Sequence, residues 1–186
     1  LAKENQKHFE MEKSRVQYFH GDLESFLATE RPTYDLVLCH AVINWTADPH
    51  AFLSSLITLC STKTVWLSLV FGSSTAKALR FAQDGNIQDL LSVVQAPGSA
   101  VSSLIETEKV RPLDPDTLFQ WLNDEQCTIV FRAGIRVFAD YVNPSLLKND
   151  STLENIKQAE NIARKNERYW KLGQLIHVIV HKQIGT

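Results

Sequence analysis

Long apolar runs, paired cysteines and an excess of charge of one sign are all missing from this sequence of 186 residues. No run comes near the roughly 20 apolar residues of a membrane-spanning helix, and the first residues do not read as a signal peptide. The cysteines Cys39, Cys60 and Cys127 are isolated among apolar neighbours. We therefore expect buried thiols, with neither disulfides nor metal ligands, in a cytoplasmic protein without a membrane partner.

The charge balance excludes a general attraction to nucleic acid. The net charge is −2, so an RNA partner would need a local basic patch. Hydrophobic residues make up 44% of the chain and charged residues 22%, which is ordinary for a globular protein with a full core. At this length we expect one domain, covering residues 1–186.

The most informative stretch is 34–49. An apolar run at 36–39 leads into a short polar and aromatic loop at 40–45. Asp48 and Pro49 then provide a helix N-cap and a favoured first helical residue. In an open α/β sheet, ligands bind beyond the carboxyl ends of the strands, so the loop is predicted to meet a small molecule.

Strand-like and helix-like segments alternate through the first half of the chain. Expected strands are 16–19, 35–39, 64–71, 127–138 with a bend at Gly134, and 175–182. Expected helices are 1–13, 49–60, 75–82, 114–122 and 151 to about 170. The alternation predicts a parallel, doubly wound sheet, and the last two long strands predict an antiparallel pair at its edge. Residues 84–112 are predicted to form an inserted lid or substrate-binding region.

Three blocks carry a family resemblance. They are Cys-His-Ala-Val-Ile-Asn-Trp-Thr-Ala-Asp-Pro (39–49), Gly-Ile-Arg-Val-Phe-Ala-Asp-Tyr (134–141) and Leu-Gly-Gln-Leu-Ile-His-Val (172–178). With the order of elements, they resemble the class I S-adenosylmethionine-dependent methyltransferases, and among them the bacterial tRNA 5-carboxymethoxyuridine methyltransferase family. The resemblance implies a Rossmann-like α/β fold with an antiparallel C-terminal strand pair. It also implies methyl transfer to the carboxylate of a modified wobble uridine in the tRNA anticodon loop.

The chain departs from the family pattern in three places. The family's Gly-rich loop and its ribose-binding acidic residue would precede Leu1, so we expect an N-terminally truncated domain. The usual Pro-Gly-Gly turn is replaced at 61–63 by Ser-Thr-Lys. A lysine-rich stretch associated with the insert is absent, since 99–109 contains one lysine.

The resemblance implies four cofactor-binding residues. Asp22 and Leu23 would meet the adenine through a side-chain acceptor and a backbone N–H, and the alternative for Asp22 is a turn or helix cap. His40 would lie against the methionine part of S-adenosylmethionine, and its alternative is a structural histidine. Trp45 would form one wall of a cofactor or base pocket, because an aromatic face suits a cation or a stacked base; its alternative is core packing.

Arg136, Tyr141 and Asn44 are the predicted substrate-binding residues. An arginine can bind a carboxylate or phosphate bidentately, although a surface arginine paired with a nearby acid is the alternative. The family has a histidine where this chain has Ala139, which predicts an altered substrate contact.

The chemistry implied by the resemblance needs no catalytic base. A carboxylate has a pKa of about 4 and is already ionised at neutral pH. Placing it in line with the positively charged sulfonium can supply about 7–11 kcal/mol of the barrier. We therefore expect positioning residues and no catalytic triad. The alternatives are a class I methyltransferase for a small carboxylate or other substrate, and a non-catalytic fragment or binding module.

Overall fold

The computed structural model describes residues 17–29, 34–59, 64–95 and 111–183. Internal packing divides the chain into two units, residues 1–32 and 33–186. No helix in the described ranges is long and apolar enough to cross a bilayer.

The described part of the first unit is one short helix and the segment before it. Helix α2 (Leu23–Thr29) is capped by Asp22, whose carboxylate accepts from the backbone N–H of Ser25 at 2.7 Å. The strand expected at 16–19 is wrong over its described residues, which form no regular structure. Phe19 instead packs on Phe26 of α2, with ring centroids 5.1 Å apart. The helix expected at 1–13 lies outside the described residues.

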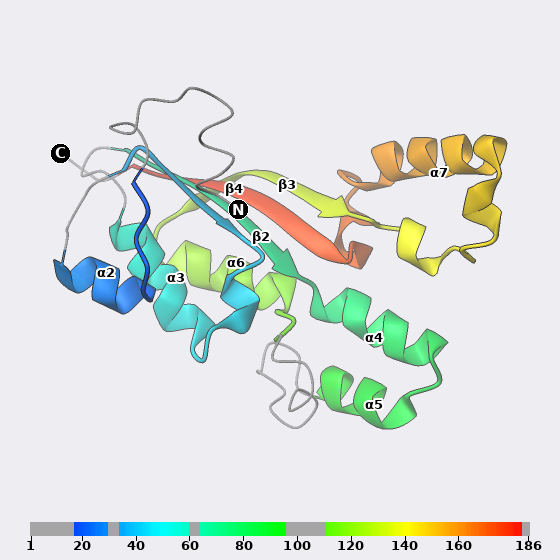
Figure 1. Ribbon diagram of the computed structural model, residues 1–186, viewed down its shortest axis with the longest axis horizontal. Coiled ribbons are helices and arrows are strands. Elements are labelled where there is room, and N and C mark those ends of the chain that lie inside the picture. The colour runs from blue at the N-terminus through cyan, green and yellow to red at the C-terminus, as the bar shows by residue number, and fades with distance from the viewer. Residues whose placement is uncertain (1–16, 30–33, 60–63, 96–110, 184–186) are drawn as a thin grey trace. The chain divides into compact units, whose positions relative to one another are not determined.

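The second unit is built on a four-stranded sheet with the order β1-β2-β4-β3. Strands β1 and β2 are parallel, and β4 runs antiparallel to both β2 and β3. The α/β fold with a reversed C-terminal strand pair is therefore confirmed (Figure 1). The strands are β1 (Leu36–His40), β2 (Thr64–Gly72), β3 (Thr128–Ile135) and β4 (Leu175–Gln183).

Helices fill the connections between these strands. The α-helices are α3 (Pro49–Thr58), α4 (Ser74–Gln83), α5 (Ile87–Gln95), α6 (Pro115–Asp124) and α7 (Asp150–Ala163). Short 3₁₀ turns are η2 (Ile43–Trp45), η4 (Ala139–Tyr141), η5 (Leu146–Lys148) and η6 (Trp170–Leu172). Both predicted Asp-Pro caps are confirmed, since Asp48 and Asp114 accept from the third backbone N–H beyond them at 3.0 and 2.8 Å.

Helix α7 is shorter than predicted. It has 14 residues and is capped by Asn149, so it begins before Ser151 and ends well before residue 170. Just past its end, the carbonyl of Arg164 accepts from the backbone N–H of Gly134 at 2.7 Å. This bond to β3 marks the point where the chain leaves the helix.

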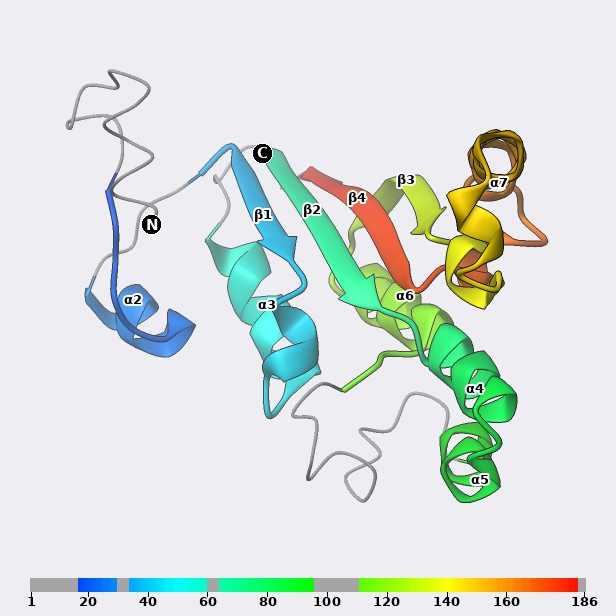
Figure 2. The same cartoon turned by 45° about the vertical axis from the view of Figure 1, so that its right-hand side comes forward.

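One face of the sheet carries the core. Helices α3 and α6 cover this face (Figure 2). Alternate strand residues point toward them, as the period of two requires. The buried side chains of this layer include Cys39, Leu53, Leu56, Leu67, Leu69, Phe71, Leu118, Leu122, Ile176, Val178 and Val180.

The opposite face of the sheet is different in character. We call it the open face and define it by Leu36, Leu38, His40, Trp66, Ser68, His177 and His181, which share one side of the sheet by register. Leu36, Leu38 and Trp66 are 52, 63 and 41% exposed. In the part of the chain that the structure describes, no helix covers these apolar side chains.

Strand β3 ends in a close approach between two backbones. A Cβ placed on Gly134 would lie 2.3 Å from the carbonyl oxygen of the buried Trp170, and one on Gly173 would lie 2.8 Å from Gly134 Cα. This close contact explains why the residue at the predicted bend, Gly134, has no side chain. The strand ends at Ile135 rather than 138, and its irregularity falls earlier, between Ile129 and Phe131.

Candidate functional site

A pocket of about 280 Å³ lies at the carboxyl ends of β1 and β2. Both strands point to the same edge of the sheet (Figure 2), so the loops that follow them meet there. The start of β4 and the segment before α6 complete its walls. The described lining residues are Ala41, Asn44, Trp45, Gly72, Ser73, Lys77, Pro112, Gln174 and Leu175.

The loop after β1 is held in a defined turn. Ala41 has a φ of +56°, and its backbone N–H donates to the carbonyl of Val70 at 2.7 Å. Ile43 is fully buried, and the hydroxyl of Thr46 donates to its carbonyl at 2.8 Å. The buried Ile43, one bond to β2 and one bond within the loop therefore fix the conformation of the loop.

The side chain of Asn44 connects the segments of backbone that form the pocket wall. It is 3% exposed, accepts from the backbone N–H of Gly72 at 2.7 Å and donates to the carbonyls of Gly72 and Arg111 at 3.3 and 2.5 Å. The N–H of Arg111 returns a bond to the Asn44 carbonyl at 2.7 Å, and its guanidinium donates to Ala47 at 2.6 Å. The amide predicted to meet substrate thus joins three segments of backbone.

Trp45 lines the pocket with its indole 59% exposed. Core packing, the alternative considered for this residue, is not what the structure shows. The exposed ring is therefore available to a molecule that enters the pocket.

His40 lies at the end of β1 with its ring on the open face. Its Nε2 is 2.9 Å from the hydroxyl of Ser68, and that hydroxyl is 2.9 Å from Nε2 of His177. Burial lowers the pKa of His177, and the neighbouring His40 lowers it further. The ring therefore has the structural contacts considered as its alternative, while a cofactor contact through its backbone stays a prediction.

Metal ligation has no support in this region. In the described ranges, no group of three or more His, Cys, Asp or Glu side chains is arranged to hold a metal ion. Burial raises the thiol pKa of Cys39 and of Cys127, which is the expected behaviour of buried, unreactive cysteines.

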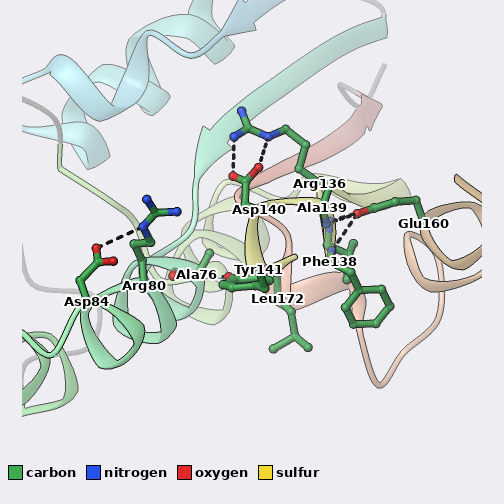
Figure 3. A network of polar contacts seen from close by, with 11 residues as sticks. Ala76, Arg80, Asp84, Arg136, Phe138, Ala139, Asp140, Tyr141, Glu160 and Leu172 are labelled. Atoms are coloured by element: carbon green, nitrogen blue, oxygen red, sulfur yellow. Dashed lines mark hydrogen bonds and ion pairs between the residues drawn. The ribbon is translucent and has the colours of Figure 1, made fainter. Parts of the chain in front are cut away.

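The loop after β3 contains Arg136 and Tyr141, and Figure 3 shows how both are engaged. The guanidinium of Arg136 forms a two-point ion pair with Asp140, one bond being 2.7 Å. The hydroxyl of Tyr141 lies within hydrogen-bond distance of the carbonyls of Leu172 and Ala76, at 3.2 and 3.4 Å. Burial, and secondarily Asp140, raises the pKa of this phenol. Tyr141 thus braces the first turn of α4.

A carboxylate from α7 fixes the same loop. Glu160 accepts from the backbone N–H groups of Val137, Phe138 and Ala139 at 2.9, 2.7 and 2.8 Å (Figure 3). Three charge-assisted bonds hold these successive amides, so the conformation of the loop depends on α7.

Asp22 and Leu23 belong to the first unit. Bonds from Ser25 lower the pKa of the Asp22 carboxyl. The helix cap considered as the alternative role is present, and the adenine contact stays a prediction for both residues.

Sequence reasoning missed Lys77. This residue lies in the first turns of α4, directly after β2, and its ammonium is 4.9 Å from the centroid of the Phe81 ring. Among the described residues that line the pocket, it carries the only full charge. The available signal was its position just beyond the carboxyl end of an apolar strand.

Comparison with known proteins finds two relatives that align with most of this chain. The chain is 29% identical over 167 residues to the tRNA 5-carboxymethoxyuridine methyltransferases of Escherichia coli O157:H7 and of strain K12. The resemblance found in the sequence is confirmed. Each alignment covers 90% of this chain and 61% of the relative, so the chain spans less than two thirds of the length of these methyltransferases. No protein-family model matches the chain.

Solved methyltransferase structures give weaker matches. The plantazolicin methyltransferase BamL, in complex with a triazolic desmethylPZN analog and SAH, is 13% identical with a TM-score of 0.41, covering 87% of this chain and 58% of its own. The plantazolicin methyltransferase BpumL in complex with SAH is 18% identical with a TM-score of 0.39, covering 88 and 56%. The functional argument therefore depends on the sequence relationship to the tRNA methyltransferases.

Proposed function

We propose that the protein containing this chain transfers a methyl group from S-adenosylmethionine to the carboxylate of 5-carboxymethoxyuridine at the wobble position of tRNA. The observation that carries the proposal is the 29% identity over 167 residues to two enzymes named for that reaction. The activity is proposed for the complete protein, because the chain spans 61% of the relatives' length.

The residues around the pocket fit one side of the cofactor. Trp45 offers an exposed aromatic face, which attracts a cation such as a sulfonium. Ala41 and Gly72 leave room beside it because their side chains are small or absent. The volume of about 280 Å³ is close to the lower end of the roughly 300–1,000 Å³ of small-molecule pockets. We propose that Trp45 and the backbone at His40 hold the methionine end of S-adenosylmethionine.

The composition of the pocket suits transfer to a carboxylate. The bound cofactor supplies an electrophilic methyl group, and an ionised carboxylate attacks it without losing a proton. The protein's task is then to orient the acceptor and exclude water. The rigid loop at Ala41 to Thr46 and the frame built on Asn44 provide that kind of fixed surface. Arg136 stays a proposed substrate contact, available once its bond to Asp140 opens.

Transfer of radioactive methyl from S-adenosylmethionine, catalysed by the full-length protein, tests the proposal. We expect label on tRNA that carries 5-carboxymethoxyuridine and none on the same tRNA without that modification. Mild alkali should release the label, because the product is a methyl ester. Absence of label above background on the modified tRNA contradicts the proposal.

Trp45 gives a sharper version of this test. Base–aromatic and cation–aromatic contacts contribute about 1–3 kcal/mol, so Trp45→Ala should lower kcat/KM by roughly 5- to 150-fold. The matched variant Trp45→Phe keeps an aromatic face and should retain most of the activity. Activity of Trp45→Ala equal to that of the unmodified protein would show that the ring does not take part.

A small carboxylic acid is the second candidate substrate. It is favoured by the net charge of −2, which does not attract RNA. Label transferred to a free carboxylic acid, with none on tRNA, would select this candidate.

A further inference from the structure

We propose that the turn after α7 is a binding surface for the phosphate backbone of RNA. We call it the basic turn and define it by Arg164, Lys165 and Arg168, which are all exposed. The inference rests on the proposed function, because it names the part of this chain that holds the RNA strand while one nucleotide occupies the pocket. With a net charge of −2, the protein needs such a local patch to attract RNA.

Positive charge is concentrated in the segment from 164 to 171. The segment contains four lysines and arginines and one acid, Glu167. Glu167 pairs with Arg132 at 2.5 Å, and the hydrogen bond from that guanidinium lowers the pKa of the Glu167 carboxyl. Lys171 pairs with Asp116 at 2.7 Å. Because these four side chains neutralise one another in two pairs, the excess charge of the segment lies in the basic turn.

In the part of the chain that the structure describes, no carboxylate pairs with the cations of the basic turn. Glu160, the last acid of α7, accepts instead from three backbone N–H groups of the loop after β3. The Lys165 ammonium lies 5.0 Å from the centroid of the Phe131 ring, a contact that leaves its charge in place. Arg164 and Arg168 can each bind a phosphate through two parallel hydrogen bonds.

The backbone of the basic turn is fixed by its own contacts. The carbonyl of Arg164 accepts from the N–H of Gly134 at 2.7 Å, and the side-chain oxygen of Asn166 accepts from the N–H of Arg168 at 2.9 Å. The buried Trp170 follows and donates its backbone N–H to the Asn166 carbonyl at 3.0 Å. Binding therefore has to order the long side chains but not the backbone that carries them.

The basic turn leads directly into the wall of the pocket. The carbonyl of Lys171 accepts from the hydroxyl of Ser73 at 3.2 Å, and Gln174 and Leu175 line the pocket together with Ser73. Leu175 pairs with the end of β2, where Figure 1 shows the chain returning from α7 to the sheet. Gln174 is the sixth residue after Arg168, so their Cα atoms are at most about 22 Å apart. Because every nucleotide carries a phosphate, a strand with one base at the pocket presents negative charge over this distance.

The same cations also have a structural role, which the test must separate from RNA binding. Positive charge at the C-terminus of a helix interacts favourably with the helix dipole, and α7 ends at Ala163. That interaction contributes to thermal stability and does not change how RNA binding depends on salt. Each phosphate contact, in contrast, adds to the slope of log affinity against log salt concentration.

The test measures this slope for the full-length protein and RNA hairpins, between about 50 and 200 mM salt, with S-adenosylhomocysteine present to prevent turnover. Arg164→Gln combined with Arg168→Gln should lower the slope by about 1.4–1.8, because each lost phosphate contact removes about 0.7–0.9. Binding should weaken equally for hairpins with 5-carboxymethoxyuridine or uridine, since phosphate contacts do not read the base. Arg164→Lys combined with Arg168→Lys keeps the charge and should preserve the slope.

Arg80→Gln combined with Lys157→Gln is the matched control. It removes the same charge at two exposed positions where the cation already pairs with an acid of its own helix, Asp84 at 3.1 Å and Glu154 at 3.5 Å. The control should leave the slope unchanged. Circular dichroism and S-adenosylhomocysteine binding show that each variant is folded.

The outcomes separate the surface from the proposed reaction. A slope that is unchanged without Arg164 and Arg168, or that falls equally in the control, overturns the role of the basic turn whether or not methyl transfer to tRNA occurs. A slope that depends on the basic turn, in a protein that does not methylate the modified tRNA, supports the surface and contradicts the reaction. Binding of the unmodified protein to phosphatidylserine vesicles, with none to the hairpins, also overturns the proposal.

Discussion

The hydroxyl of Ser68 lies between two imidazole rings, 2.9 Å from Nε2 of His40 and 2.9 Å from Nε2 of His177. One hydroxyl has a single proton, so it can donate to only one of the two rings at a time. The other ring must then act as the donor. The donor and acceptor roles of the two rings are therefore linked through Ser68.

The lowered pKa of His177 predicts how stability depends on pH. Burial and the nearby His40 lower the pKa of His177 in the folded protein, whereas an unfolded histidine titrates near 6.5. The unfolded chain thus takes up the proton first, and stability falls as the pH drops below about 6.5 toward the folded pKa. Urea unfolding between about pH 7.5 and about pH 5.5 should show a smaller loss for His177→Gln than for the unmodified protein. Parallel losses in the two proteins would contradict this role.

At the scale of single elements, the sequence predicted correctly those features that depend only on neighbouring residues. The Asp-Pro pairs at 48–49 and 114–115 predicted two helix starts because a cap needs only the next three residues. The structural role of Asn44 was missed because its partners lie 28 and 67 residues away. For Trp45 the sequence left core packing and a pocket wall as alternatives, and it did not single out Lys77. Whether a residue is buried or lines a pocket depends on how the strands are ordered, which local sequence does not determine.

Two predictions from local patterns were wrong: the end of α7 and, over the described residues, the strand near Phe19. Their sequences have suitable local patterns, but contacts with other segments decide the outcome. The carbonyl of Arg164 accepts from the backbone N–H of Gly134 on β3, and Phe19 packs on Phe26 of the following helix α2. Propensity is a weak guide wherever such a contact competes with it.

The close backbone contact between β3 and η6 predicts that adding a methyl group at Gly134 lowers stability. Gly134→Ala should lower the free energy of unfolding by about 1–3 kcal/mol, because the new Cβ would lie 2.3 Å from the Trp170 carbonyl oxygen and the chain must shift. The matched control is Gly72→Ala, whose Cβ would meet the Asn44 side chain at an ordinary 3.6 Å. Denaturant titration of both variants measures the difference. Equal stability would show that the β3 turn relaxes without cost.

At the scale of the second unit, β1 is an edge strand of the four-stranded sheet. Its pairing with β2 uses one side of its backbone, and Leu36 and Leu38 add exposed apolar side chains to the open face. Edge strands of this composition are templates for association with another chain.

This edge predicts concentration-dependent self-association of the isolated chain. Leu38→Lys should reduce it, because a lysine on an edge strand opposes pairing and Leu38 is 63% exposed. Sedimentation velocity over a concentration series measures the effect. Leu79→Lys, at an exposed position on α4 away from the sheet, is the control. Association that persists in Leu38→Lys, or that falls equally in both variants, would exclude the β1 edge as its cause.

The difference in exposure between Trp45 and Trp170 makes intrinsic tryptophan fluorescence a probe of the pocket. Trp45 is 59% exposed at the pocket and Trp170 is 1% exposed in the core. A water-exposed indole emits at longer wavelengths than a buried one, so Trp45, together with the partly exposed Trp66 of the open face, contributes the red side of the emission spectrum. A ligand that stacks on Trp45 should quench the Trp45 share of that side, leave the blue side in place, and have no such effect in Trp45→Phe. Occupancy of the site can then be followed by intrinsic fluorescence, without a label on either partner.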